Sequence, residues 1–188
     1  MENDLKKKPD EELLQRSRKG DAGAFKELVR RYEAKVAATV IGMVGRNDEA
    51  DDIGQETFIR FYNALNSFRG DSSIGTYITR IAMNLSLNAL RRRERRRFLF
   101  KSIDTENELQ EPAAENGAGR FEQSEILRSA MQRLSPKYRA VVTLRLAQGY
   151  STEETARMLR IPVGTVLSRL QRAQKKLQTL LRAYKEDF

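Results

Sequence analysis

Apolar positions recur at steps of three and four residues along most of the chain, which is the spacing of amphipathic helices. In the first hundred residues this pattern predicts a helix from Asp10 to Gly20 and a second one beginning after Asp21. We expect Asp10 and Asp21 to cap these helices, and Gly42 and Gly45 to break the second. The apolar face of the second helix comprises Phe25, Leu28, Val29, Tyr32, Val36 and Val40.

Two more helices are predicted before residue 100. The third begins near Asn47–Asp48, and a loop at Gly70–Ser73 separates it from a fourth that runs from about Ser73 to Arg97. The third should bury Ala50, Ile53, Thr57, Phe58, Phe61, Leu65 and Phe68, and the fourth Ile74, Tyr77, Ile78, Ile81, Ala82 and Leu85. No stretch has the alternation of a strand, so the sequence predicts an all-α fold.

The segment 151–181 predicts two helices joined by a tight turn. Ser151 and Glu154 have the spacing of a capping box, and Pro162 prevents the first helix from continuing through Ile161. The second helix should bury Val163, Val166, Leu170, Ala173, Leu177 and Leu181. Its opposite side carries Thr165, Ser168, Arg169, Arg172 and Lys176. A helix-turn-helix with such side chains is typical of a major-groove reader, so these five are candidate DNA contacts.

A polar segment divides the chain into two helical domains, residues 1–100 and 124–188. Between them, residues 101–123 contain two basic and six acidic side chains, together with Pro112, Gly117 and Gly119. Such a segment cannot bury enough apolar surface to order itself, so we expect a flexible acidic linker. Its charge serves either solubility or the imitation of nucleic acid inside a basic channel.

Composition favours a polyanionic partner over an enzyme. The 188 residues include 35 Lys and Arg against 26 Asp and Glu, for a formal net charge of +9. There is no His and no Cys, so the usual acid–base, thiol and zinc sites are missing. We expect no catalysis, no metal and no cofactor. The N-terminus is charged, and the longest weakly polar stretch, 36–45, is far short of the roughly 20 residues that span a bilayer. We therefore expect a cytoplasmic protein without membrane insertion.

Two polar surfaces stand out in the first domain. On the third helix, Asp51, Asp52, Gln55 and Glu56 project away from the apolar face, either as a solvated face or as a docking surface. On the fourth helix, a polar row contains Arg80, Asn84, Arg91 and Arg95. This helix ends in a run with six arginines among residues 91–97, a density typical of phosphate binding. Arg92, within this run, is also a candidate DNA contact.

Three motifs resemble those of bacterial sigma factors, in particular the small extracytoplasmic-function (ECF) group. EADDIGQETF at 49–58 resembles the helix that binds core RNA polymerase, and TYITRIAMNL at 76–85 with the following arginines resembles the promoter-melting helix. LSPKYR at 134–139, GYSTEETA at 149–156 and GTVLSRLQRA at 164–173 resemble the family's C-terminal helix-turn-helix domain. The motifs occur in the family's order.

The resemblance implies a role for each surface. Asp51, Asp52, Gln55 and Glu56 would bind the polymerase clamp, and the loop at Phe68–Gly75 with the Asn84 face would handle the downstream promoter element. The second helix of the helix-turn-helix would read the upstream element. The linker would thread through the polymerase toward the RNA exit channel, and an anti-sigma factor is implied as a partner. Asn88 is a further candidate DNA contact on the fourth helix, at a position where the family commonly has Asp. Tyr77 replaces a usual Trp, and Leu167 a frequent basic residue.

Two alternatives remain at this point. A helix-turn-helix transcriptional regulator with an unrelated helical sensor domain would bind its operator alone and leave the Asp51–Glu56 surface without a polymerase. A basic protein lying on a membrane surface is less compatible with arginine faces that lack aromatic anchors.

Overall fold

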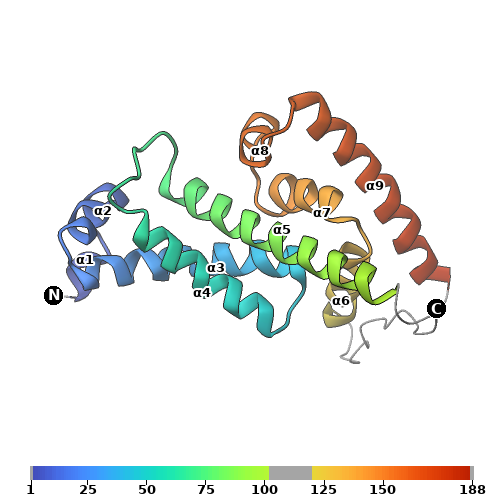
Figure 1. The fold of residues 1–188 in the computed structure, drawn as a ribbon, viewed down its shortest axis with the longest axis horizontal. Coiled ribbons are helices and arrows are strands. Elements are labelled where there is room, and N and C mark those ends of the chain that lie inside the picture. Colours follow the sequence, from blue (N-terminus) through green and yellow to red (C-terminus); the bar gives the residue numbers. More distant parts are fainter. Residues whose placement is uncertain (1, 102–119, 187–188) are drawn as a thin grey trace. The chain divides into compact units, whose positions relative to one another are not determined.

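The computed structural model describes residues 2–101 and 120–186, and within these ranges every regular element is a helix (Figure 1). The elements are α1 (Glu2–Leu5), α2 (Asp10–Arg18), α3 (Ala22–Val44), α4 (Asp48–Asn63), α5 (Ile74–Lys101), α6 (Arg120–Gln132), α7 (Pro136–Val142), the π-helix η1 (Thr143–Ala147), α8 (Thr152–Leu159) and α9 (Val163–Glu186). The expected all-α class is confirmed. In this part of the chain no helix is long and apolar enough to cross a bilayer.

The helices form two compact units. The first contains α1, α2, α4, most of α3 and the first half of α5, and the second contains the rest of α5, the last turn of α3 and α6 to α9. Most of the predicted linker, residues 102–119, lies outside the described residues. Residues 120–123, also placed in the linker from sequence, form the first turn of α6. The domain limits at residues 100 and 124 stay a prediction.

Local capping signals identify two helix starts correctly. The Asp21 carboxylate accepts a hydrogen bond from the Ala24 amide at 3.0 Å, and the Asn47 side chain accepts from the Ala50 amide at 3.1 Å. Each side chain thereby accepts from an amide in the first turn of its helix, where amides lack the usual carbonyl four residues earlier in the helix.

Two predictions about helix ends are wrong. Asp10 does not cap α2: it is the first helical residue, and its carboxylate accepts hydrogen bonds from Arg31 and Tyr32 of α3 instead. Gly42 does not break α3, which continues to Val44 and ends at Gly45 with a φ of +85°. A single helical glycine costs only about 1 kcal/mol, which packing along a 23-residue helix outweighs.

Aromatic contacts join three helices within the core of the first unit. Phe61 of α4 is fully buried and lies 6.0 Å from Phe25 of α3 and 6.2 Å from Tyr77 of α5, measured between ring centroids. Phe68, in the loop after α4, meets the edge of Tyr77 at 4.9 Å. Phe58, expected in the core, is only partly buried. These contacts fix α3, α4 and α5 against one another.

An ionic network joins the N-terminal helices to α3. Glu27 of α3 is buried and receives hydrogen bonds from Arg30 at 2.7 Å and Arg31 at 2.9 Å. Arg31 also donates to Asp10 of α2 at 2.7 Å and to the Leu5 carbonyl of α1. The hydrogen bond from Arg30 lowers the pKa of Glu27 to about 2, against the opposing effect of burial.

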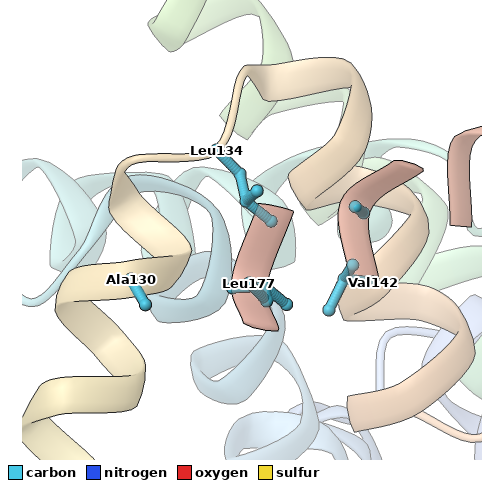
Figure 2. Close-up of a cluster of buried hydrophobic side chains, with 5 residues drawn as sticks. Ala130, Leu134, Val142 and Leu177 are labelled. Carbon is cyan, nitrogen blue, oxygen red and sulfur yellow. The ribbon is translucent and has the colours of Figure 1, made fainter. Parts of the chain in front are cut away.

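Two apolar clusters hold the second unit together. One joins α6, α7 and α9 through Ala130, Leu134, Val142, Ala173 and Leu177 (Figure 2). The other consists of Val141 of α7, Ala156 of α8 and Val166 of α9. Because Val166 and Leu177 are eleven residues apart on α9, this helix is fixed at two levels, and its opposite side remains exposed.

Candidate nucleic-acid and polymerase interface

The helix-turn-helix begins with the predicted capping box. The Ser151 hydroxyl accepts from the Glu154 amide at 3.0 Å, and the Glu154 carboxylate accepts from the Ser151 amide at 2.7 Å. Helix α8 then ends at Leu159, followed by Arg160 in the left-handed conformation with a φ of +54°. The turn lasts until Pro162, and α9 starts at Val163, so the predicted order of helix, turn and longer helix is confirmed.

The outer side of α9 presents the side chains expected to read DNA. Ser168, Arg172 and Lys176 are exposed, whereas Thr165 and Arg169 are half-buried at the edges of this side. The Ser168 hydroxyl donates to the Thr165 carbonyl at 3.2 Å, and its oxygen can still accept a hydrogen bond. The sequence prediction thus placed all five polar residues outside the core.

One apolar residue of this helix was wrongly assigned to the core. Val163 was expected in the core but is 41% exposed, because the cluster with Val141 and Ala156 begins one turn later, at Val166. Leu167 is 54% exposed and lies between Val166 and Ser168 on the outer side. Leu167 is therefore an exposed apolar side chain among the candidate DNA contacts of this helix.

The outer side of α4 carries the predicted acidic and amide patch. Asp51, Asp52 and Gln55 are exposed, and Glu56 is half-buried and accepts from Arg60 at 2.7 Å. The opposite side is closed by the buried residues Ala50, Ile53, Thr57 and Phe61. The patch is therefore free to meet a partner while α4 stays packed in its unit.

Sequence reasoning missed an apolar extension of this patch. Ile59 is 54% exposed and Tyr62 is 52% exposed. They follow Gln55 by four and seven residues, so they continue its side of the helix toward the C-terminal end of α4. This helical spacing is the sequence signal from which their exposure could have been predicted. Exposed apolar side chains with polar residues around them are typical of a protein docking surface. We call these six residues, Asp51, Asp52, Gln55, Glu56, Ile59 and Tyr62, the α4 surface.

Helix α5 carries a continuous row of polar side chains. Arg80 is half-buried, with its guanidinium carbon 5.1 Å from the centre of the Tyr77 ring. Asn84, Asn88, Arg91, Arg92 and Arg95 follow on the same side and are all exposed. Phe98, near the end of the arginine run, is 79% exposed and was not singled out from sequence.

The loop between α4 and α5 lies at the start of this row. Arg69, Gly70, Asp71 and Ser73 are exposed, and Gly70 has a φ of +81°. The Ser73 hydroxyl accepts from the Thr76 amide at 3.2 Å and thereby caps α5. The loop thus presents small polar groups and backbone at the head of the α5 row.

Two family models and two curated relatives are similar to this chain. Residues 28–96 match the family model described as Sigma-70 region 2, and residues 124–177 match the one described as Sigma-70, region 4. The chain is 39% identical to the ECF RNA polymerase sigma-E factor of Escherichia coli over 92% of this chain and 96% of that protein. It is 35% identical to the RNA polymerase sigma-H factor of Pseudomonas aeruginosa, over 95% of this chain and 98% of that protein.

Solved structures show the same fold. The sigma factor RpoE of Bartonella quintana, solved in complex with the anti-sigma factor NepR, superposes with a TM-score of 0.66 and 25% identity over 84% of this chain and 96% of that one. CnrH, solved in complex with the cytosolic domain of CnrY, also superposes with a TM-score of 0.66. Its sequence identity is 26% over 93% of this chain and 97% of that one.

The match to region 2 over residues 28–96 contradicts the alternative of an unrelated sensor domain, because α4 and most of α5 fall inside that match. The match to region 4 contains α8 and most of α9. Together, the two matches cover the surfaces identified on α4, α5 and α9. The chain therefore belongs to the sigma-70 family and is an ECF-type RNA polymerase sigma factor, which binds core RNA polymerase and promoter DNA.

Proposed function

We propose that this sigma factor divides transcription initiation among three exposed surfaces. The α4 surface binds core RNA polymerase, the loop and polar row of α5 bind and hold the opened downstream element, and the outer side of α9 reads the upstream element. The observation that carries the proposal is that each surface lies opposite a buried apolar face of its own helix. The exposed groups can therefore serve a partner without weakening the core.

The α4 surface has the chemistry of a protein contact. Its four carboxylate and amide residues can form charged hydrogen bonds, and Ile59 and Tyr62 add apolar area that a partner can cover. Its carboxylates would repel the phosphates of DNA, so this surface is not suited to bind DNA. A basic and partly apolar helix on the polymerase is the complement that it fits.

A charge reversal tests this assignment. Asp52→Lys combined with Gln55→Ala should lower the affinity for core polymerase in a titration while the helix content by circular dichroism stays unchanged. Glu33→Lys is the matched control, because Glu33 is an exposed acid on α3 and the substitution changes the charge by the same amount. An unchanged affinity of the double variant would remove the α4 surface from the polymerase contact.

The outer side of α9 fits a major groove. Its N-terminal half presents Thr165, Ser168 and Arg169 toward base edges, and Arg172 and Lys176 follow at positions suited to phosphates. The capping box and the two apolar clusters hold this helix rigidly, which a base-reading element requires.

The α5 row fits an opened strand. A base exposes its pairing edge to a side chain such as Asn84 only when it leaves the stack, and unstacking costs roughly a few kcal/mol. The arginines at the C-terminal end of α5 can hold neighbouring phosphates. A surface that binds the opened strand in preference to duplex promotes melting.

Run-off transcription tests the whole proposal. The chain, core RNA polymerase and fragmented genomic DNA should yield transcripts whose start sites share an upstream and a downstream element. Transcripts without shared elements, or no gain over core polymerase alone, would contradict the proposal.

We also propose that the protein acts in the cytoplasm, with its polymerase, as a non-catalytic binding subunit without a cofactor. An anti-sigma factor is its proposed antagonist, supported by the complex in which the similar RpoE was solved. An anti-sigma factor captured from the source cell with the chain as bait should block its assembly with core polymerase. An antagonist that binds the chain without blocking assembly would contradict this step.

A further inference from the structure

The exposed loop between α4 and α5, residues 69–73, is attached at both ends to one short helix. That helix is α2, which neither family match includes. The first attachment is made by Arg18, the last residue of α2. Its Nε donates to the Leu65 carbonyl at 2.8 Å, and its Nη2 donates to the Phe68 carbonyl. These carbonyls belong to the turns that follow α4, immediately before the loop.

The second attachment is made by Asp10, the first residue of α2, through Tyr32. Asp10 accepts a hydrogen bond from the Tyr32 hydroxyl, and the Tyr32 ring lies directly against Gly75. A Cβ atom added at Gly75 would lie 2.8 Å from Cε1 of Tyr32, so the backbone at the start of α5 can approach this ring only as glycine. Burial, with the hydrogen bond to Asp10, raises the pKa of Tyr32 above its ordinary value, so its hydroxyl stays protonated and donates to Asp10 even in alkaline solution.

The two attachments have a fixed separation. Asp10 and Arg18 are eight residues apart on one helix, which at 1.5 Å per residue spans about 12 Å. The ends of the loop are thereby held apart by a rigid helix, while residues 69–71 between them are exposed. A short loop with both ends fixed has few conformations, which lowers the entropy lost when it binds a ligand.

We propose that Arg18 is a positioning residue for promoter opening: through the Leu65 and Phe68 carbonyls it holds the 69–73 loop in the shape that accepts an unstacked base of the non-template strand. Arg18 itself does not touch DNA. The inference rests on the proposed role of this loop and of Asn84. Its consequence is that α2 determines how well the loop selects sequence, while core binding and phosphate binding do not depend on Arg18.

The test uses holoenzyme assembled from core polymerase and the full chain. The probe is a single-stranded DNA oligonucleotide selected from a randomised pool on the wild-type holoenzyme, compared with a scrambled oligonucleotide of the same composition. Arg18→Ala should lower the ratio of the two affinities by about tenfold, the lower end of what the loss of a hydrogen bond to a charged group produces. Binding of the scrambled oligonucleotide should not change, because phosphate contacts do not depend on the loop.

Arg16→Ala is the matched control. It removes the same charge from the same helix, but Arg16 pairs with Asp21 at 2.8 Å rather than with the loop. A purely structural role of α2 would lower the amount of active holoenzyme or both affinities together, and would leave their ratio unchanged. If Arg18→Ala fails to fold, Arg18→Lys replaces it. This variant keeps the charge but has one ammonium group for two carbonyls. Its ratio of the two affinities should therefore be lower than that of wild type but still above one.

The outcomes are distinct. A ratio in Arg18→Ala or Arg18→Lys equal to that of wild type overturns the inference and leaves the loop's proposed role intact. A wild-type holoenzyme for which no preferred oligonucleotide can be selected overturns the proposed role of the loop, and the inference with it. A reduced ratio in Arg16→Ala equal to that in Arg18→Ala also overturns the inference, because it assigns the effect to helix charge.

Discussion

Val166 and Leu167 are neighbours on α9 with opposite environments, and exchanging each for alanine should separate folding from DNA reading. Val166 is fully buried against Val141 and Ala156, whereas Leu167 is 54% exposed. Val166→Ala removes two buried methyl carbons, worth about 0.8 kcal/mol each in transfer free energy. The cavity left behind increases the loss in the free energy of unfolding to about 2–3 kcal/mol.

The measurement is thermal unfolding followed by circular dichroism. In a domain of this size each 1 kcal/mol corresponds to a shift of about 4–8 °C in Tm, so Val166→Ala should lower the transition of the second unit by about 10–20 °C. Leu167→Ala should change the free energy of unfolding by less than about 0.5 kcal/mol, because the side chain makes little contact with the core. Leu167→Ala should instead alter the preferred upstream sequence, since an exposed leucine can contact a thymine methyl group.

Two results would refute this reasoning. An unchanged transition in Val166→Ala would mean that α8 and α9 do not pack through this cluster. A destabilisation by Leu167→Ala as large as that by Val166→Ala would mean that the outer side of α9 is covered within the folded chain and does not face DNA.

Three further predictions concern the promoter contacts and the response to acid. Arg169→Ala and Arg172→Ala should each reduce promoter-dependent transcription; a contact to guanine would appear as a loss of about 1–3 kcal/mol of base discrimination, and a phosphate contact as a uniform loss over all sequences. Asn84→Ala should slow open-complex formation, followed by permanganate reactivity, more than it weakens binding to duplex, and normal melting would contradict its role. Because Arg30 lowers the pKa of Glu27 to about 2 from a usual 4.5, Glu27 stabilises the fold fully above pH 4.5, and this contribution disappears as the pH falls toward 2. Urea unfolding across this range should show a flatter acid limb in Glu27→Gln, and an unaltered limb would rule out this carboxylate as the cause.

Features that depend on neighbouring residues were predictable from the sequence. The Ser151–Glu154 capping box and the Asn47 cap are formed within three residues, and both are found in the structure. The sides of α4 and α9 likewise follow from helical spacing, since Asp52 and Arg172 are exposed and Ile53 and Ala173 are buried.

Features that depend on distant parts of the chain were not predictable. Asp10 has a side chain that commonly caps helices, but in the structure it accepts a hydrogen bond from Tyr32, 22 residues away. Arg18 reads as one more surface charge, and its hydrogen bonds to carbonyls 47 and 50 residues away are visible only in the folded unit. The π-helix η1, which follows α7, likewise has no signal in the local sequence pattern.

The way in which Arg18 holds the loop has an evolutionary consequence. Its hydrogen bonds go to the main-chain oxygens of Leu65 and Phe68, which every residue type possesses, and not to side chains of the loop itself. The exposed positions Arg69 and Asp71 can therefore accumulate substitutions while the backbone that presents them keeps its shape. Given the role proposed for this loop, relatives can diverge in the promoters they select while the loop backbone keeps its shape, and loops exchanged between relatives should retain their selectivity wherever this arginine is present.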